Sequence, residues 1–314
     1  MDYYLGVDGG QSSTTALIGD ASGRVVGVGR GGPCNHVGAS EARSRFLDAV
    51  GGCIREACAQ AGLPEPCFAS AVLGFSGGPE DKEALAGELI QSPKMHVTHD
   101  ALIALAGACA GEPGLITIAG TGSIAFGRNQ KGMTARAGGW GYVFGDEGGA
   151  FDIVRQALRA ALRNEEGWGP PTALRDLLLE ETGAQDTNEL LHLFYTPGYP
   201  RSRVAKLAKL VDQAAIEGDE VAWRILERAA EELALLAGAV RGQLFHPGER
   251  ARVSYIGGVF RGDLLRARFQ MLIELEEGNV FAPPVYGPAA GALIEAYRQA
   301  GVRADLAGLP PAEK

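Results

Sequence analysis

The stretch YYLGVDGGQSSTTALIGDASGRVVGVG, residues 3–29, decides the fold of this chain. Apolar and β-branched residues lie on both sides of Asp8, Gly9 and Gly10. Runs of this kind, bounded by turn residues, are typical of strands. An acid and two glycines at a hairpin tip could have no role beyond the turn, because both residue types tolerate turn geometry. We expect three consecutive strands, over residues 3–7, 13–19 and 24–30.

The loop from Gly9 to Ser13 is longer than a tight two-residue hairpin requires. Its small side chains leave backbone N–H groups open, and a run of open N–H groups can bind anionic oxygens. Asp8 would repel a phosphate in this place unless a cation lay between them. Mg²⁺ commonly bridges carboxylate and phosphate oxygens. The loop is therefore compatible with a Mg²⁺–phosphate site as well as with an ordinary turn.

Two common phosphate-binding loops do not fit this stretch. A P-loop requires the pattern G-x-x-x-x-G-K-[ST], and the dinucleotide-binding loop opens a helix. Residues 14–18, which follow the loop here, form a short run rich in β-branched side chains. Such a run indicates a strand. A phosphate bound by this loop would therefore lie at a β-hairpin.

Length and composition narrow the class of protein. The chain has 314 residues, enough for about two domains, and a formal net charge of −9. This acidic balance argues against a nucleic-acid partner or an anionic membrane surface, since both favour basic patches. No apolar run approaches the ~20 residues of a membrane span. The five cysteines form no C-x-x-C pair, so we expect no disulfide framework, no zinc ribbon and a cytoplasmic location.

The strand pattern of the opening stretch recurs later in the chain. Residues 114–139, GLITIAGTGSIAFGRNQKGMTARAGG, again suggest strand, glycine-rich turn, strand, polar turn and strand. This repeat suggests a duplicated unit. Two such hairpins, if they face each other across a cleft, could hold both ends of a polyphosphate. Elsewhere we expect strands over 70–75, 95–98 and 253–258, and helices over 40–62, 101–110, 151–162, 172–181, 186–195, 202–217, 219–245, 263–276 and 288–300.

Seven short stretches, in order along nearly the whole chain, resemble the N-acetylglucosamine kinase family. This family lies within the BadF/BadG-type ATPase group of the actin-like superfamily, which includes hexokinase and Hsp70. The GGWG…GDEGG block is the most specific of the seven. The stretches are LGVDGG (5–10), GFSGG (74–78), HDA (99–101), GTGS (120–123), GGWGYVFGDEGG (138–149), IGGVF (256–260) and GPAAGA (287–292).

The resemblance implies an α/β fold of two duplicated ribonuclease-H-like domains. Each domain would contain a mixed five-stranded sheet, and the active site would lie in the cleft between the domains. One actin-like ATPase domain would comprise residues 1–112 with the C-terminal helix 289–309, and the other residues 113–288. The glycine- and proline-containing loop 111–114 marks the boundary.

On the nucleotide side, the resemblance implies ATP with Mg²⁺. Asp8 matches the family's acid that interacts with Mg²⁺, often through water. Two phosphate-binding hairpins and an adenosine-binding turn complete this side. Their residues are Gly9, Gly10, Ser12, Ser13 and Thr14 in the first hairpin, Gly120, Thr121, Gly122 and Ser123 in the second, and Gly257 and Gly258 in the turn.

Asp100 has two compatible interpretations. It directly precedes the helical sequence ALIALAGACA, where a carboxylate is a common N-cap. It also matches the family's catalytic base, which accepts the proton of a sugar hydroxyl as that hydroxyl attacks the γ-phosphate. A carboxylate held at a helix start is well oriented, so the first role does not exclude the second.

The sugar side would draw on residues from both halves of the chain. The resemblance implies contacts from Asn35, Ser76, Gly77, Asp100, Gly139, Trp140 and Asp146. A tryptophan among glycines could instead fill the core. Asp146 could instead be a turn acid that precedes the next helix.

The activity that the resemblance implies is ATP-dependent phosphorylation of an amino sugar at its 6-hydroxyl, with N-acetylglucosamine as the first candidate. Glucosamine, N-acetylmuramic acid and hexoses stay as alternatives, because a few pocket contacts separate these sugars. Other classes are a BadF-type ATPase activator of a redox enzyme and a non-catalytic sugar sensor. Cys34 and Cys109 do not lie in the contexts of iron–sulfur ligands, which disfavours the activator. Long amphipathic helices in the second half, and the dimers common among related kinases, favour a homodimer joined through the C-terminal domain.

Overall fold

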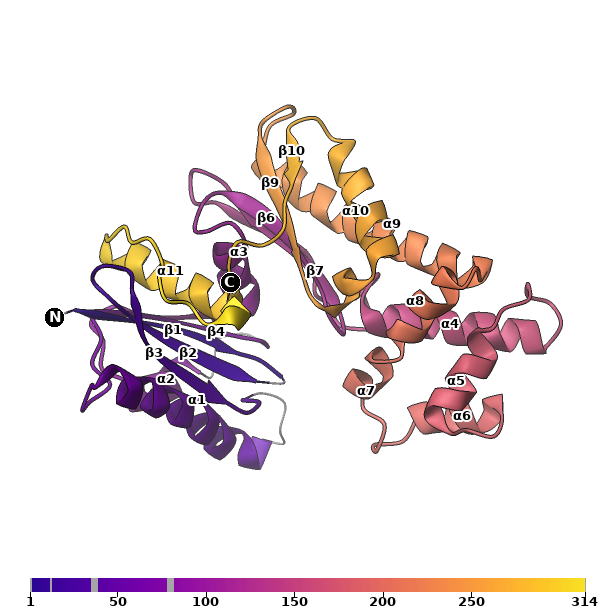
Figure 1. Cartoon of the computed structure of the whole chain (residues 1–314), viewed down its shortest axis with the longest axis horizontal. Helices are drawn as coiled ribbons and strands as arrows, with labels where there is room; N and C mark the ends of the chain where they lie inside the picture. The colour runs from indigo at the N-terminus through magenta and orange to yellow at the C-terminus, as the bar shows by residue number, and fades with distance from the viewer. Residues whose placement is uncertain (1, 12, 35–38, 78–81, 314) are drawn as a thin grey trace. The chain divides into compact units, whose positions relative to one another are not determined.

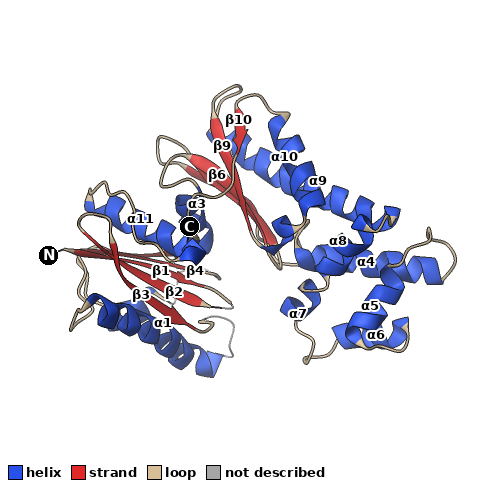
Figure 2. Ribbon diagram, in the orientation of Figure 1, coloured by secondary structure: helices blue, strands red, loops and turns tan. Residues whose placement is uncertain are grey.

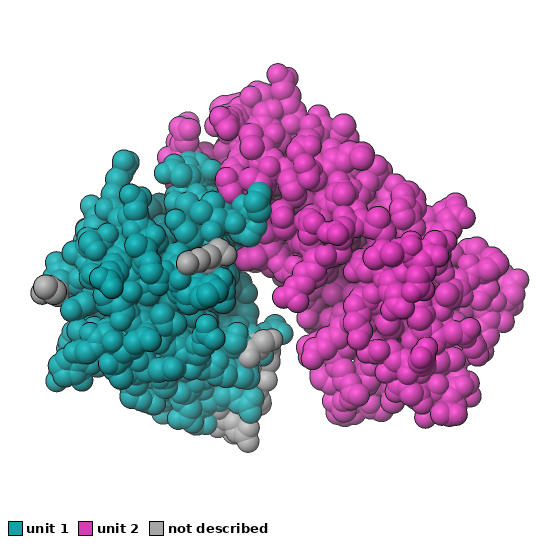
Figure 3. Space-filling model, viewed as in Figure 1, with its two compact units in different colours: residues 1–114, 283–314 teal, residues 115–282 magenta. Residues whose placement is uncertain are grey.

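The computed structural model describes residues 2–11, 13–34, 39–77 and 82–313, and the chain divides into two compact units. The first unit comprises Met1–Gly114 and Pro283–Lys314, and the second comprises Leu115–Ala282 (Figure 3). Each unit contains one five-stranded sheet with helices packed against it (Figures 1 and 2).

The sheet of the first unit has the strand order β3-β2-β1-β4-β5. Strands β1, β2 and β3 form an antiparallel meander, whereas β4 pairs in parallel with both β1 and β5. The sheet is therefore mixed, as expected. Its strands are Tyr3–Gly9 (β1), Thr14–Asp20 (β2), Val25–Gly31 (β3), Ser70–Phe75 (β4) and Met95–His99 (β5).

The alternation of side chains along β1 explains why both faces of this sheet are covered. Leu5 and Val7 are buried on one face with residues of helix α1 (Ala39–Ala61). Tyr4 is buried on the other face with residues of α3 (Asp100–Ala108) and α11 (Pro288–Ala300). Figure 1 shows α1 and α11 on opposite sides of the sheet. Successive strand residues point to opposite faces, so a continuous apolar run requires cover on both sides.

Helices α3 and α11 cross at close range where two glycines meet. A Cβ atom on Gly291 would overlap the carbonyl oxygen of Ile103 and the backbone nitrogen of Gly107. A Cβ atom on Gly107 would overlap the carbonyl oxygen of Gly287. The obstructing atoms belong to the backbone, so a side chain at either position would push one helix away. The absence of side chains at Gly107 and Gly291 therefore sets the distance between α3 and α11.

The second unit repeats the topology of the first. Its strand order is β10-β9-β6-β7-β8, so β6, β7 and β8 take the places that β1, β2 and β3 have in the first sheet. Strands β7 and β8 pair antiparallel, while β9 pairs in parallel with β6 and β10. The expected duplication and the second mixed sheet are therefore confirmed. The strands are Gly114–Ala119 (β6), Ser123–Arg128 (β7), Thr134–Gly138 (β8), Ala251–Ile256 (β9) and Asn279–Phe281 (β10).

Helices supply most of the core of the second unit. The longest, α9 (Glu220–Leu244), buries Ala229, Leu233 and Val240, which lie on one apolar stripe with Val221 and Ile225. None of the helices within the described ranges combines the length and the apolar composition of a membrane span. The other long helices are α4 (Ala150–Glu165), α5 (Leu174–Thr182), α6 (Thr187–Phe194) and α10 (Asp263–Glu274).

Several short elements differ from the expectations. The expected helix 202–217 is divided into α7 (Arg201–Ala205) and α8 (Ala208–Ile216). The expected strand 253–258 ends earlier, and the 3-10 turn η1 (Gly258–Arg261) follows it. Helix α2 (Glu83–Leu89), strand β10 and the 3-10 turn η2 (Pro311–Glu313) are additional. Such short elements contain too few residues for a periodic pattern to identify them.

Replacing Gly291 by alanine is expected to lower the free energy of unfolding by about 1–3 kcal/mol, because the methyl group overpacks the crossing of α3 and α11. Gly238→Ala in α9 is the matched control, since a Cβ atom there meets no atom within 4 Å. The control should raise stability by about 0.5–1 kcal/mol, because glycine is a poorer helix former than alanine. Urea unfolding measures both changes, and equal effects of the two substitutions would contradict the close crossing.

Candidate active site

The carboxyl ends of three parallel strands lie at one edge of the first sheet. Strand β4 pairs in parallel with β1 on one side and with β5 on the other. Three residues predicted for the site, Asp8, Ser76 and Asp100, lie at or directly after the ends of these strands. Ligands of open α/β sheets bind beyond the carboxyl ends of the strands. The parallel pairing therefore gathers residues that are far apart in the sequence.

Asp8 lies near the end of β1, opposite Gly74 of β4, and its side chain is partly buried. Burial, together with the negative charges of Glu313 and Asp100, raises the pKa of this carboxyl group from 3.8 to about 7. A carboxyl group with such a pKa has too little positive charge around it. The surroundings of Asp8 therefore favour a bound proton or a bound cation.

Glu313, in η2, is an acid at this edge that the sequence does not single out. Its side chain is buried, and its Oε2 accepts a hydrogen bond from the N–H of Ala290 in α11 at 3.0 Å. Burial raises the pKa of Glu313, while the N–H groups of Ala290 and Ala289 oppose this shift. A Cβ atom on Gly287 would overlap the carboxyl group of Glu313. The C-terminal segment thus brings a third carboxyl group near enough to act on Asp8.

Asp100 is the first residue of α3, and the N-cap is His99. The Nδ1 atom of His99 accepts a hydrogen bond from the N–H of Leu102 at 3.3 Å. The interpretation of Asp100 as the N-cap is therefore wrong. Burial raises the pKa of Asp100, while the charges of His99 and Lys82 and the N–H of Ala101 oppose this shift. A carboxylate with a raised pKa accepts a proton more readily than an exposed aspartate does.

Lys82 brings positive charge to the same edge. Its Nζ donates a hydrogen bond to the carbonyl oxygen of Ser76 at 2.7 Å and lies 5.4 Å from the centre of the Phe75 ring. Its charge also lowers the pKa of Asp100. Gly77, directly after Ser76, has a φ of +81°, a backbone conformation that favours glycine. No motif surrounds Lys82 in the sequence, so only the fold identifies it as a site residue.

The first hairpin is more closed than a phosphate-binding nest. The N–H of Gly10 donates to the carbonyl oxygen of Ser13 at 2.9 Å. Thr14 is buried, and its hydroxyl donates to the carbonyl oxygen of Gly32 at 2.8 Å. Contrary to expectation, the N–H of Gly10 and the hydroxyl of Thr14 are therefore not open to a phosphate. Ser13 is exposed at the hairpin tip.

Packing already explains the glycine at position 9. A Cβ atom on Gly9 would overlap the ring of Phe75, so this position requires glycine with or without a ligand. Ser12 and Asn35, which are also predicted for the site, lie outside the described residues. Their roles stay predictions.

The GTGS loop, residues 120–123, forms the corresponding hairpin of the second unit. The N–H of Gly120 donates to the carbonyl oxygen of Gly122 at 2.9 Å. Helix α4 begins against this loop, because the N–H of Ala150 donates to the carbonyl oxygen of Gly120 at 2.9 Å. The N–H of Phe151 donates to the carbonyl oxygen of Thr121 at 3.1 Å. The first N–H groups of a helix have no partner within the helix, so the GTGS loop completes the start of α4.

Asp146, which is predicted to contact the sugar, is engaged within the second unit. Its Oδ1 accepts the N–H of Ser123 at 3.3 Å, and its Oδ2 pairs with Arg201 at 3.0 Å. The side chain is buried, and the backbone has a φ of +65°, which is uncommon for any residue but glycine. A Cβ atom on Gly122 would meet the Asp146 carboxyl group. Asp146 therefore holds the GTGS loop, and Arg201 is a further site residue that the sequence does not predict.

The GGWG stretch presents an exposed tryptophan. The side chain of Trp140 is 65% exposed, and the guanidinium group of Arg136 lies 4.6 Å from the ring centre. The alternative that Trp140 fills the core is therefore wrong. Gly139, directly before it, has a φ of +74°. An aromatic ring on a glycine-rich loop offers a large apolar face to a ligand.

Gly257 and Gly258 follow β9 at the carboxyl end of that strand. Gly257 has a φ of +114°, and a Cβ atom there would overlap the carbonyl group of Ala119 at the end of β6. Gly258 begins η1, and a Cβ atom there would meet no atom within 4 Å. The turn therefore approaches the start of the GTGS loop because position 257 has no side chain.

The sequence of this chain matches one known protein family over most of its length. Residues 5–296 match the family described as the BadF/BadG/BcrA/BcrD ATPase family. The chain belongs to this family.

Similar proteins agree with the BadF/BadG/BcrA/BcrD assignment. N-acetylmuramic acid/N-acetylglucosamine kinase of Clostridium acetobutylicum is 34% identical over 287 residues, which cover 89% of this chain and 93% of that protein. N-acetyl-D-glucosamine kinase of Dictyostelium discoideum is 30% identical over 272 residues, which cover 82% of this chain and 85% of that protein. The crystal structure of a putative N-acetylglucosamine kinase from Chromobacterium violaceum has a TM-score of 0.73 at 27% identity, covering 94% of this chain and 98% of that one. The predicted resemblance and the actin-like α/β fold are therefore confirmed.

Asp8 offers a carboxylate oxygen, the kind of donor that Mg²⁺ prefers. Its side chain is partly accessible, and its pKa is raised first by burial and then by the negative charges of Glu313 and Asp100. Mg²⁺ usually keeps several waters and binds through one or two carboxylates together with phosphate oxygens. Within the described ranges, no three acid, histidine or cysteine side chains are arranged to hold a metal ion. Asp8 fits a metal that brings most of its ligands with the nucleotide.

We expect Asp8→Asn to raise the melting temperature of the ligand-free protein at about pH 8. The folded-state pKa of about 7 exceeds the ordinary 3.8, so ionisation of Asp8 costs more in the folded chain than in the unfolded chain. This cost is absent below the unfolded pKa, grows until the pH passes the folded pKa, and is constant above it. The stabilisation should therefore vanish near about pH 4.

Differential scanning calorimetry across this pH range measures the effect of Asp8→Asn. Asp48→Asn, which removes an exposed carboxylate on α1, is the matched control. A variant that is no more stable than the wild type at about pH 8 would contradict the cost of ionising the buried Asp8.

Proposed function

We propose that this protein transfers the γ-phosphate of ATP to the 6-hydroxyl of an amino sugar, with N-acetylglucosamine as the first candidate. Membership of an ATPase family supports the use of ATP. The names of the relatives, which are N-acetylglucosamine or N-acetylmuramic acid kinases, support an amino sugar as the acceptor. Glucosamine and hexoses are the alternative acceptors.

The observation that carries the proposal is the carboxylate of Asp100 at the carboxyl edge of the first sheet. Burial raises its pKa, which makes it a suitable proton acceptor. In the proposed step, the sugar hydroxyl oxygen forms a bond to the γ-phosphorus while the bond from this phosphorus to the bridging oxygen breaks. Asp100 accepts the hydroxyl proton, and ADP leaves with the electron pair of the broken bond.

Phosphoryl transfer depends mainly on positioning and on neutralisation of charge. Asp8 would hold the Mg²⁺ that enters with ATP, directly or through water, and the metal would neutralise charge on the phosphates. Thr121 and Gly122 would supply loop atoms near the β- and γ-phosphates. Gly257 and Gly258 would line the adenosine, since the lack of side chains lets a ligand approach the backbone.

The sugar would be held by residues on exposed, glycine-rich turns. Gly77, Gly139 and Trp140 are exposed and Ser76 is half-buried in such a turn, which supports the assignment. We assign Asp146 a positioning role for the GTGS loop, because both of its carboxylate oxygens already have partners. A hydrogen bond to the acetamido group would give strong preference for N-acetylated sugars.

We also infer a homodimer and a cytoplasmic location. Ile216, Leu235 and Leu275 of the second unit are large, exposed and apolar, which supports association through this unit. The five cysteines are free thiols, four of them buried, and free thiols suit a reducing compartment.

Asp100→Asn is expected to lower kcat by about a hundredfold or more, because asparagine cannot accept the hydroxyl proton. Sugar and ATP affinities, measured by calorimetry, should change little. The assay is ADP formation with N-acetylglucosamine, glucosamine, N-acetylmuramic acid and glucose, and Asp48→Asn is the control. Near-wild-type turnover by a folded Asp100→Asn would remove the base assignment, and ADP formation that needs no sugar would contradict the kinase proposal.

Lys82→Met is expected to move the acidic limb of the kcat/KM profile to higher pH. The positive charge of Lys82 lowers the pKa of Asp100, so its removal should raise that pKa. The base must be ionised to act, and the loss of activity on acidification would therefore begin at a higher pH. Lys131→Met, in an exposed turn of the second unit, is the control. An unmoved profile would show that a group other than Asp100 limits the reaction at low pH.

A further inference from the structure

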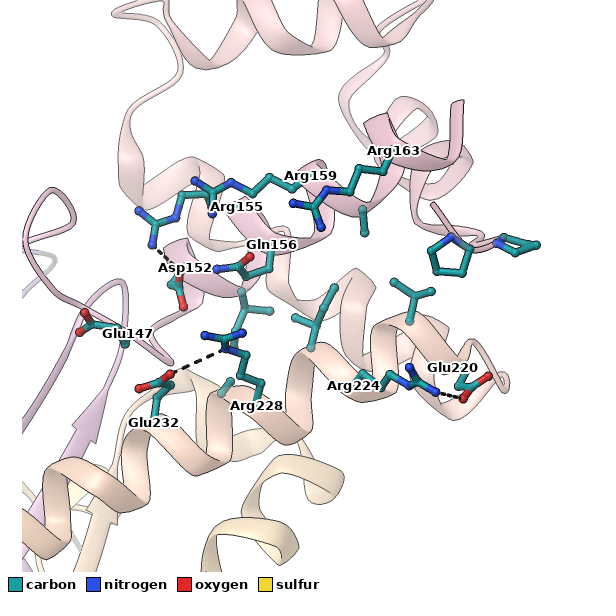
Figure 4. A pocket seen from close by; sticks show the side chains of 17 residues that line it. Glu147, Asp152, Arg155, Gln156, Arg159, Arg163, Glu220, Arg224, Arg228 and Glu232 are labelled. Atoms are coloured by element: carbon teal, nitrogen blue, oxygen red, sulfur yellow. Dashed lines mark hydrogen bonds and ion pairs between the residues drawn. The ribbon is translucent and has the colours of Figure 1, made fainter. Parts of the chain in front are cut away.

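A groove between α4 and α9 of the second unit has no part in the proposed reaction. Its cavity has a volume of about 590 Å³. Sites for small molecules commonly measure about 300–1,000 Å³. Figure 4 shows Glu147 and Asp152 toward one end of the cavity and Arg163 toward the other. The two ends of the groove therefore carry side chains of opposite charge.

Arginines line both walls of this groove at a spacing of four residues. Helix α4 contributes Arg155, Arg159 and Arg163, and α9 contributes Arg224 and Arg228. Residues four apart lie on the same side of a helix, where like charges repel one another. Figure 4 shows the two rows on opposite sides of the cavity. In a chain with a net charge of −9, these rows concentrate positive charge in one place.

Carboxylates neutralise only part of the two rows. Arg159 and Arg163 are exposed and take part in no ion pair within the part of the chain that the structure describes. Arg163 lies over the ring of Trp168, 4.8 Å from its centre. The positive excess is therefore localised on Arg159 and Arg163. The pairs that do form are Arg155 with Asp152 at 2.6 Å, Arg224 with Glu220 at 2.5 Å, and Arg228 with Glu232 at 3.7 Å.

The floor between the two rows is apolar. Val221 and Ile225 of α9 are half-buried and line the cavity together with Ala160 and Ala229. Val221 and Ile225 belong to the apolar stripe of α9, yet part of their surface stays open to the groove. A ligand that fits must therefore combine an anionic group with a compact body that can cover apolar carbon atoms.

We propose that this groove binds a phosphate monoester with a sugar-sized ring. The phosphate would lie on Arg159 and Arg163, and the ring would cover Val221 and Ile225. Guanidinium groups bind phosphate oxygens in pairs, and a monoester dianion matches two unneutralised cations. A neutral sugar would leave both arginines without a counter-charge, and a purely apolar ligand would remove them from water at a cost.

The groove is linked to the GTGS loop through two elements. Glu147 lines the groove, and its carbonyl oxygen accepts a hydrogen bond from the hydroxyl of Ser123 at 2.6 Å. Helix α4, which forms one wall, begins with the bond from Ala150 to Gly120 in the same loop. A ligand that shifts α4 relative to α9 therefore changes the GTGS loop. Because that loop is proposed to contact ATP, the ligand would change the affinity for ATP.

Calorimetric titrations with ribose 5-phosphate, inorganic phosphate and ribose test the site without reference to catalysis. The proposal expects ribose 5-phosphate to bind more tightly than inorganic phosphate, and ribose not to bind. Arg159→Glu/Arg163→Glu should weaken the binding of ribose 5-phosphate by about tenfold or more, because the phosphate then meets two carboxylates. Arg45→Glu, an exposed arginine on α1, is the matched control and should leave the affinity unchanged.

Equal affinity of the wild type and Arg159→Glu/Arg163→Glu would overturn the proposal, because the ligand would then bind elsewhere. No binding of ribose 5-phosphate at millimolar concentration would also overturn it. Circular dichroism confirms that the variant is folded. Ribose 5-phosphate should also change the KM for ATP of the wild type by about fivefold and leave that of the variant unchanged. A wild-type KM that does not respond would contradict the link to the GTGS loop.

Discussion

Burial of three carboxyl groups that have little positive charge around them is the constraint on which the proposed site depends. Parallel pairing of β1, β4 and β5 fixes Asp8 and Asp100 at one edge of the first sheet. The first turn of α11 fixes Glu313 near them. Burial raises the pKa of all three, and the charge of Lys82 offsets only part of the shift at Asp100. An edge with this charge balance favours a metal-bound phosphate and a hydroxyl that must lose its proton.

The second unit has the same topology and uses the same edge of its sheet for a different purpose. Its GTGS loop is held by the buried carboxylate of Asp146 and by the first N–H groups of α4. Because such an anchored loop is already ordered, it loses little conformational entropy when a ligand binds, which favours binding. The first unit thus offers buried carboxyl groups with raised pKa values, and the second offers a fixed loop. Duplication of one fold provides both, because strand order determines where each loop lies while the loop residues determine its chemistry.

Local patterns predict most of the fold and the candidate residues at strand ends. Turn residues between β-branched runs locate both meanders, and the duplication follows from their similarity. The hydrogen-bond partner of an individual polar group depends on contacts between distant parts of the chain, which a local sequence pattern does not contain. The hydroxyl of Thr14 donates to the carbonyl oxygen of Gly32, directly after β3, and His99 replaces Asp100 as the N-cap. Lys82 and Glu313 join the site only because the chain folds back on itself, and neither lies in a recognisable motif.

Proton release on binding of Mg²⁺–ATP tests most directly whether Asp8 receives the metal-bound nucleotide. With a pKa of about 7, Asp8 carries about half a proton at pH 7 in the ligand-free protein. A metal cation beside the carboxylate would displace that proton. Isothermal titration in buffers of different ionisation enthalpy measures the number of protons released, and comparison with Asp8→Asn removes the contribution of ATP itself. The account predicts that the wild type releases about half a proton more than Asp8→Asn at pH 7, and equal release by the two proteins would contradict it.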